Sequence, residues 1–399
     1  MTKIPEWWMK DKLVNMLSSL IDYRWKTPTP SETWIITLSA KSVKMWFIDY
    51  DQAYHISKET YDKFMTRWFP KKWDILMTTE APLWCIAKLD RDDVSVAQRL
   101  LTLRWKEWEL DNNYMMYYLM SQAWQHELLS RMSWSTVWWI SRKQFDNVEI
   151  ILPPLSEQKA IAGVLSAFDD KIELLKAENQ TLEEMGQTIF KERFGKYKVW
   201  DELPNGWKVG KLGEVVEFII DNRWKTPLTS DKWDYPMVEI NSIIWDSMII
   251  DINNCKKFVD QELYDTWFRK WHPKKWDVLF STVWSIWEIA FVFDEIFCIA
   301  QNIVWLRSKY WKYMYLLLKS IQWNLKALDI SSVQPSIKLP HLLDYDIVIP
   351  DEIIIKDFET KVNPIFEKIN NNWKQINALI STRDQLLPKL MSWEVRVKF

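Results

Sequence analysis

Two long segments of the chain carry apolar residues at the three- and four-residue spacing of an α-helix. The first runs from Ser156, a candidate N-cap, to Phe194, and Glu157 in its first turn favours the helix dipole. The second segment shows the same spacing 197 residues later. Spacing sustained over several heptads predicts coiled-coil helices. The predicted apolar stripes contain Leu165, Phe168, Ile172, Leu175, Leu182 and Ile189 in the first helix, and Val362, Ile365, Ile369, Ile376, Leu379 and Leu386 in the second.

Polar residues and prolines interrupt these stripes. Asn179 and Asn372 lie within them, and a polar residue at such a position sets register or orientation at some cost in stability. Pro364 and Pro388 lie near the ends of the second stripe. We expect them to kink or terminate that helix, because proline lacks the backbone N–H. The alternative of two separate helices, each lying on its own domain, stays open at this point.

The regions before the two helices mix short β-branched and aromatic runs with a few helical stretches. VEIILP at residues 148–153 is typical of a strand, whereas residues 112–129 and 310–328 have helical patterns. Each region therefore predicts a globular domain of α+β or α/β class with about 150 residues. The expected parts are a globular domain at 1–153, a helix at 154–198, a second globular domain at 199–350 and a second helix at 351–399.

The two halves of the chain repeat one another. IDYRWKTP at residues 21–28 recurs as IDNRWKTP at 220–227, and PKKWDILMTT at 70–79 recurs as PKKWDVLFST at 273–282. Leu103-Arg104 likewise matches Leu306-Arg307. The order of the motifs is kept, and their offsets differ by only a few residues. This pattern indicates a tandem duplication of one domain plan.

The balance of tryptophan and glycine is unusual. The chain has 29 Trp and only 6 Gly in 399 residues, whereas glycine is normally about 7% of a protein. Many of the tryptophans stand in turn contexts where positive φ makes glycine the default residue. We hypothesise that the source organism reads the UGA codon as glycine, and the alternative is a genuinely Trp-rich protein. The expected glycines include Trp25, Trp73, Trp224, Trp276, Trp287 and Trp393, whereas Trp8 and Trp207 are expected to be true tryptophans.

Charge, cysteine content and hydropathy limit the class of protein. The net charge is -2, so a strongly basic, free-standing DNA-binding protein is disfavoured, although local patches and partners also supply phosphate contacts. The three cysteines are widely separated, which is typical of reduced thiols in a cytosolic protein. The sequence contains no run of 18 apolar residues, and its first residues are too polar for a signal peptide. We therefore expect a cytoplasmic location.

Three segments resemble one known family, the specificity subunits of type I restriction-modification systems. Residues 152–194, LPPLSEQKAIAGVLSAFDDKIELLKAENQTLEEMGQTIFKERF, are similar to the central conserved region of that family. Residues 379–397 resemble its C-terminal signature, with Trp393 in the place of a glycine, and residues 203–218 resemble the start of its second recognition domain. The resemblance covers essentially the whole chain. Its departures are tryptophans at glycine positions of the family.

The resemblance implies a function and a set of partners. Two target-recognition domains would each read one half of a split double-stranded DNA target, and two long antiparallel helices would separate them. A 39-residue helix is about 58 Å long, which exceeds one turn of DNA at about 34–36 Å. The chain itself would be non-catalytic, while modification (methyltransferase) and restriction (endonuclease) subunits would dock on it. The alternative function is a coiled-coil adaptor that does not bind DNA and has two binding heads.

Motifs of catalysis are missing from the sequence. Restoring glycine would give GKT at residues 25–27 and 224–226, but Leu20 and Ile219 stand where a P-loop needs its first glycine. No methyltransferase motif of the [DNS]PP[YF] type occurs, and the four histidines share no metal-ligand spacing with cysteines or acids. We therefore expect no enzyme activity, no cofactor and no metal.

Repeated basic turns are the candidates for DNA contact. The RWKT loops place two cations and a hydroxyl on one turn, and the Lys-Lys pairs suit phosphates better than bases. The alternative is that both motifs are solvated structural turns. Because base-reading residues should differ between unlike half-sites, shared motifs are poor candidates for specificity, and Gln98, Gln301 and Asn302 could read adenine or be buried hydrogen-bonding groups. The candidate contacts are Arg24, Lys26, Thr27, Lys71 and Lys72 in the first copy, and Arg223, Lys225, Thr226, Lys274 and Lys275 in the second.

Overall fold

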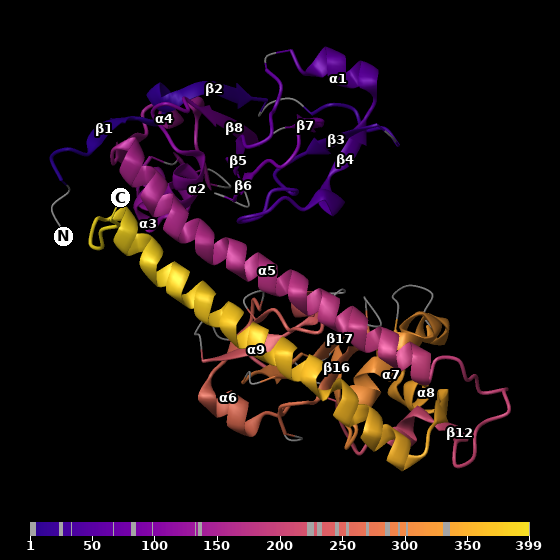
Figure 1. The fold of residues 1–399 in the computed structure, drawn as a ribbon. Helices are drawn as coiled ribbons and strands as arrows, with labels where there is room; N and C mark the ends of the chain where they lie inside the picture. The colour runs from indigo at the N-terminus through magenta and orange to yellow at the C-terminus, as the bar shows by residue number, and fades with distance from the viewer. Residues whose placement is uncertain are drawn as a thin grey trace. The chain divides into compact units, whose positions relative to one another are not determined.

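The computed structural model divides the chain into two compact units (Figure 1). The first unit contains Met1–Ile172 and Ala378–Phe399, and the second contains Glu173–Asn377. No described helix is long and apolar enough to cross a membrane. The structure describes residues 5–398 except 24–26, 33, 67, 81–84, 98, 132, 135–137, 222–226, 230–233, 244–246, 253–254, 269–270, 284–287, 294–295, 301 and 330–335.

Two sheets form the centre of the first unit. The larger is antiparallel throughout, with the strand order β2-β8-β5-β6. In the smaller sheet, β3 pairs with β4 antiparallel and with β7 parallel, and β1 pairs with β11 separately. The strands are β1 (Met9–Lys12), β2 (Leu17–Asp22), β3 (Ile35–Leu38), β4 (Tyr54–Ile56), β5 (Ile75–Thr78), β6 (Ile86–Lys88), β7 (Val94–Val96), β8 (Leu100–Trp105), β9 (Ser133–Trp134), β10 (Trp138–Trp139) and β11 (Glu149–Leu152).

Side-chain caps fix where the short helices of this unit begin. The helical stretch predicted at 112–129 is two helices, because Ser121 ends α2 and its hydroxyl accepts a hydrogen bond from the Trp124 N–H in α3. Asp111 caps α2 in the same way, and Ser141 forms a capping box with Gln144 at α4. The helices are α1 (Lys58–Phe64), α2 (Asn112–Met120), α3 (Gln122–Leu129) and α4 (Arg142–Phe145), with 3-10 turns η1 (Leu13–Met16) and η2 (Tyr50–Gln52).

The second unit repeats this plan. Its larger sheet has the order β13-β19-β16-β17, its smaller sheet the order β15-β14-β18, and β12 pairs with β20. Each strand order matches that of the first unit, so the predicted duplication is seen in the fold itself. The strands are β12 (Lys208–Lys211), β13 (Phe218–Asp221), β14 (Tyr235–Val238), β15 (Phe258–Val259), β16 (Val278–Ser281), β17 (Ile289–Phe291), β18 (Cys298–Ile299), β19 (Ile303–Arg307) and β20 (Asp346–Ile349). The helices are α6 (Gln261–Thr266), α7 (Trp311–Leu325) and α8 (Leu339–Leu343), with η3 (Leu212–Val215), η4 (Ile240–Ser242) and η6 (Lys326–Leu328).

Two helices, α5 (Leu155–Arg193) and α9 (Glu352–Met391), are far longer than the rest and lie side by side (Figure 1). In the first unit Asp169 of α5 pairs with Arg383 of α9 at 2.7 Å. In the second unit the Asn372 side-chain amide donates to Asn179 at 2.9 Å, and Arg193 pairs with Asp357 at 2.6 Å. Positions therefore rise along α5 as they fall along α9, so the two helices are antiparallel.

The predicted stripes lie largely in the interior. Leu165, Ile172, Leu175, Val362, Ile365, Ile369 and Ile376 are buried, whereas Phe168, Leu182, Ile189, Leu379 and Leu386 are half-buried. In the first unit, Leu165 of α5 and Leu390 of α9 share one apolar cluster with α2. In the second unit, Phe190 and Val362 share another cluster with α7. The helices thus pack on each other and on their globular parts together.

The ends of the long helices differ in detail from the sequence prediction. Helix α5 begins at Leu155, so Ser156 lies in the first turn rather than at the N-cap. Pro364 and Pro388 were expected to kink or terminate the second helix, but α9 continues through both to Met391, so Pro364 does not terminate it. Pro364 is exposed, whereas Val362 and Phe366 on either side are buried. Packing of those neighbours offsets the loss of one backbone hydrogen bond.

Candidate nucleic-acid interface

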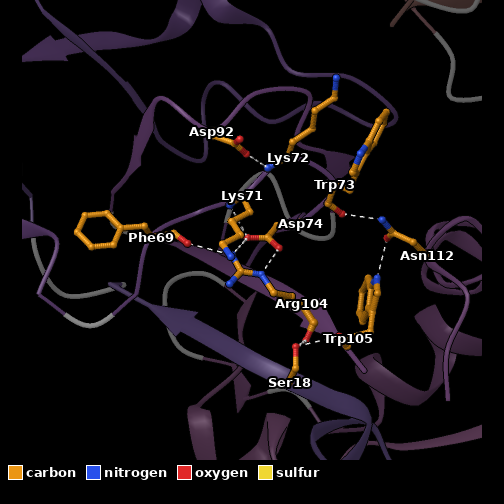
Figure 2. Close-up of polar contacts among 10 residues, drawn as sticks. All are labelled: Ser18, Phe69, Lys71, Lys72, Trp73, Asp74, Asp92, Arg104, Trp105 and Asn112. Carbon is orange, nitrogen blue, oxygen red and sulfur yellow. Dashed lines mark hydrogen bonds and ion pairs between the residues drawn. The ribbon is translucent and has the colours of Figure 1, made fainter. Parts of the chain in front are cut away.

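The PKKWD turn of the first copy is built around a buried carboxylate (Figure 2). Asp74 is 3% exposed, and its Oδ2 accepts the backbone N–H of Lys71 at 2.8 Å. The Arg104 guanidinium forms two bonds to the same carboxylate, Nε to Oδ1 at 2.7 Å and Nη2 to Oδ2 at 2.6 Å. Arg104 also donates to the Phe69 carbonyl at 2.9 Å. The fork geometry fixes the turn to strand β8.

The second copy reproduces the same contacts. Asp277 accepts the Lys274 N–H at 2.7 Å, and Arg307 Nε and Nη2 each lie 2.7 Å from its carboxylate oxygens. Burial raises the pKa of the Asp277 carboxyl, while the hydrogen bonds from Arg307 and Lys274 oppose this rise. This Asp–Arg pair was not among the residues predicted from the sequence. The available signal was that the PKKWD and Leu-Arg motifs recur at one offset, 203 residues.

The lysine side chains of both PKKWD turns are exposed, in contrast to the buried aspartates. Lys71 and Lys72 are exposed, and no described carboxylate forms an ion pair with either ammonium group. The Lys72 ammonium lies 4.8 Å from the centre of the Trp73 ring, and that of Lys275 lies 4.5 Å from the Trp276 ring. The backbone of these turns is therefore structural, while their cations remain accessible to solvent.

Left-handed backbone is concentrated at tryptophans. Seven described non-glycine residues have positive φ, and six of them are Trp, namely Trp34, Trp46, Trp73, Trp271, Trp276 and Trp393. The left-handed turns predicted at Trp73, Trp276 and Trp393 are confirmed, with φ of 77°, 76° and 62°. Trp25, Trp224 and Trp287 lie outside the described residues. The seventh residue is Arg99, with φ of 68°.

Register places the repeated motifs at opposite ends of the larger sheet. Ile75, which follows the first PKKWD turn, is opposite Leu103, whereas Asp22 and Thr78 at the other ends of β2 and β5 are opposite Leu101 and Leu100. We call the first end the turn end; it consists of Lys71–Asp74 in the first copy and Lys274–Asp277 in the second. The other end is the loop edge, made of Thr79, Glu80 and Arg99 in the first copy and Thr282, Val283 and Asn302 in the second.

Two pairs of backbone hydrogen bonds at the loop edge are the same in both copies. The Thr79 N–H donates to the Arg99 carbonyl at 3.0 Å, and the Thr282 N–H donates to the Asn302 carbonyl at 2.9 Å. The Ala97 and Ala300 amides bond to the matching strands β3 and β14, at 2.8 and 2.9 Å. These shared bonds show that the two loop edges correspond in the fold, although Arg99 has a positive φ and Asn302 does not.

Comparison with known proteins identifies the family. The family model of the type I restriction modification DNA specificity domain matches residues 31–184 and 204–372. The chain belongs to this family. Each match ends inside a long helix, so one specificity domain comprises a globular part and the helix that follows it. The two matches agree with the duplication seen in the strand order.

Individual relatives support this assignment. The chain is 27% identical over 367 residues to the type I restriction enzyme MjaIX specificity subunit of Methanocaldococcus jannaschii, covering 86% of this chain and 82% of that one. It is 37% identical over 87 residues to the MjaVIII specificity subunit of the same organism, 20% of each chain. The crystal structure of the type I restriction-modification S subunit from M. genitalium matches over 96% of each chain, with a TM-score of 0.51 and 18% identity. This last likeness shows the fold.

Each specificity domain is tied to a long helix by polar contacts. In the first, the buried Gln158 of α5 accepts the Asp111 N–H at 2.9 Å and donates to the Pro153 carbonyl at 2.9 Å. In the second, Glu359 of α9 accepts the Tyr313 N–H at 2.7 Å and pairs with the buried Lys312 at 3.1 Å. Burial raises the pKa of the Glu359 carboxyl. These buried charges and amides join the globular part to the scaffold.

The other predicted DNA contacts lie mainly in parts of the chain that the structure does not describe. Thr27 is exposed, and strand β2, which leads toward it, ends at Asp22 on the loop edge side of the sheet. Gln98 and Gln301 are not described, whereas Asn302 is described and half-buried. The predicted contacts outside the described residues are Arg24, Lys26, Arg223, Lys225 and Thr226.

Proposed function

We propose that this chain reads a bipartite double-stranded DNA sequence as the specificity subunit of a type I restriction-modification complex. One observation carries the proposal. The family of DNA specificity domains matches the chain twice, and the two matched parts share one strand order. Two such domains in one chain suit a target in two halves. Each globular part, within 1–153 and 199–350, reads one half.

The chain works in this proposal without chemistry of its own. Three carboxylates with little exposure have structural partners: Asp74 and Asp277 hold turns, and Glu359 holds a helix. Methyltransferase subunits and a restriction subunit supply methylation and cleavage, and they dock on the scaffold formed by α5 and α9. The helices at 154–198 and 351–399 are the proposed scaffold parts, and no cofactor is assigned to the chain.

Phosphate contact is assigned to the repeated cations. Lys71 and Lys72 are exposed on a turn whose backbone is fixed by Asp74, so the turn presents both ammonium groups to solvent. Lys274 and Lys275 occupy the same turn in the second copy. Such contacts position a protein on DNA without reading sequence. The RWKT residues are proposed contacts on sequence grounds.

A domain exchange tests this function. Residues 1–153 are replaced by the matching domain of a relative with a different target, and methylated sites are mapped by sequencing in cells that also contain the modification subunits. The expected result is that one half of the recognised sequence changes and the other half persists. A chain with residues 199–350 exchanged is the matched control, and it should change the opposite half.

Two outcomes contradict the proposal. If both halves change after either exchange, the domains do not read independently. If purified complex shows no preference for any split DNA sequence over scrambled DNA of equal length, the chain is an adaptor with two binding heads rather than a DNA reader.

A further inference from the structure

The loop edge places different side chains at one equivalent position of the two copies. Arg99 and Asn302 are 203 residues apart, the same offset as the two PKKWD turns. Their carbonyls accept the equivalent amides of Thr79 and Thr282, so the two residues are equivalent in the fold, although only Arg99 has a positive φ. Because residues that read unlike half-sites must differ between copies, this position has the property that the shared basic motifs lack.

Arg99 also sits in an unfavourable backbone conformation. Its φ of 68° lies in the left-handed region, and it is the only described residue other than tryptophan and glycine that does so. A side chain with a Cβ is disfavoured there, and residues held in such conformations cluster at functional sites. Glycine would relieve the strain but would remove the guanidinium. The observed arginine is therefore best explained by what its side chain does.

Glu80 forms an ion pair with Arg99, and the second copy has no carboxylate at the equivalent position. Glu80 Oε2 lies 2.9 Å from Arg99 Nε, and the side chains are 26% and 50% exposed. In the second copy the residue matching Glu80 is Val283, and the residue matching Arg99 is Asn302. Because this contact is made through Nε, the two terminal nitrogens of Arg99 have no described partner.

We propose that Arg99 and Asn302 are base-reading residues, Arg99 for a guanine in one half-site and Asn302 for an adenine in the other. Arginine pairs with guanine O6 and N7 through two nitrogens, and asparagine pairs with adenine N6 and N7 through its amide. Glu80 is a positioning residue that orients the guanidinium. This inference rests on the proposed function, since it assigns two contacts within that DNA interface.

Asn302 has the features that this role requires. Its carbonyl accepts both the Thr282 N–H at 2.9 Å and the Thr282 Oγ1 at 3.2 Å, so the backbone is doubly fixed. Its side chain is half-buried, and its amide forms no hydrogen bond with any described residue. An amide on a fixed backbone with open donor and acceptor sites can form the bidentate pair at little entropic cost.

The test is selection from a random split-site DNA library with the assembled modification complex. Arg99→Gly is the main variant, because glycine suits a φ of 68° and the fold should persist. We expect the preference for one guanine in one half-site to fall about tenfold to hundredfold, with every other position unchanged. Asn302→Ala should weaken one adenine in the opposite half-site. Lys63→Ala, on the exposed face of α1, is the matched control and should select the parental sequence.

Glu80 and the exchange of residues between copies sharpen the test. Glu80→Ala should weaken the same guanine position as Arg99→Gly, and Glu80→Asp should restore part of that preference. Arg99→Asn with Glu80→Val, the pair of the second copy, should shift that position from guanine toward adenine. If Arg99→Gly selects the parental sequence with unaltered preference, the inference is overturned while the proposed function stands. If the parental complex selects no split sequence, the proposed function itself has failed.

Discussion

The two ends of the larger sheet have diverged to different degrees between the copies. At the turn end, Asp74 and Asp277 bind arginines of the equivalent strands β8 and β19 at almost the same distances. At the loop edge the backbone bonds persist, but Arg99 with Glu80 in one copy is replaced by Asn302 with Val283 in the other. When a DNA-recognition domain is duplicated, the residues that stabilise its fold must be kept, whereas the residues that contact bases must differ if the two half-sites differ. The comparison therefore separates structural residues from specificity residues within one chain, without any second protein.

The largest expected effect on stability comes from replacing residues with positive φ by glycine. At the tryptophans the positive φ belongs to turn geometry, whereas at Arg99 we attribute it to the function of the side chain. Trp34, Trp73 and Trp271 are exposed and have φ of 116°, 77° and 80°. Replacing all three with glycine should raise the free energy of unfolding by about 1–2 kcal/mol per site. Urea denaturation measures the change. Trp8→Gly is the control and should destabilise, because Trp8 is 7% exposed and is absent from the residues with positive φ.

The same positions test whether glycine is the encoded residue. Under the recoding hypothesis Trp25, Trp73, Trp224, Trp276, Trp287 and Trp393 are UGA codons, and the backbone adds Trp34, Trp46 and Trp271 to them. Trp8 and Trp207 should be UGG. Peptide mass spectrometry of the protein from its own organism decides the question at residues 73 and 276. Tryptophan masses there would end the hypothesis, and a less stable glycine variant would contradict the strain argument separately.

The buried pair at the turn end has the next largest effect. Asp277→Ala removes both hydrogen bonds between the carboxylate and the Arg307 guanidinium, and loss of one partner from a buried pair costs about 3 kcal/mol. The cost stays at the lower end of the usual range because the Arg307 side chain is 31% exposed. Thermal or urea unfolding measures it. Asp74→Ala should cost a similar amount in the first copy, whereas an Asp277→Ala variant as stable as the parent would remove the structural role assigned to the turn end.

Sequence patterns predicted the parts of this molecule that depend on local periodicity and repetition. The stripes of Leu165 and Val362 predicted α5 and α9 because helix burial follows a fixed spacing. The termination considered at Pro364 does not occur, because the buried Val362 and Phe366 stabilise the helix across it. The role of Arg99 could not be predicted from spacing, and that of Asp277 was signalled only by the shared offset of the PKKWD and Leu-Arg motifs. One depends on a backbone angle, and the other on a contact between residues 30 apart in sequence.

The smallest expected effect is on DNA affinity, and it distinguishes phosphate contact at the turn end from base contact at the loop edge. Lys71→Ala with Lys72→Ala removes two exposed cations and leaves the Asp74–Arg104 pair intact, because the carboxylate is bonded to a backbone N–H rather than to a lysine side chain. Removal of one lysine–phosphate interaction should reduce the slope of log affinity against log salt by about 0.9, so the double variant should reduce it by at most about 2. Affinity for matched and mismatched DNA should fall by the same factor, since phosphates carry no sequence information. Fluorescence titrations of the assembled complex at several salt concentrations measure both quantities.

Arg99→Gly is the natural comparison, because it should lower the ratio of matched to mismatched affinity while changing the salt slope far less. A double lysine variant that alters that ratio would show that the turn end reads sequence too, and the division between the two ends would then be wrong.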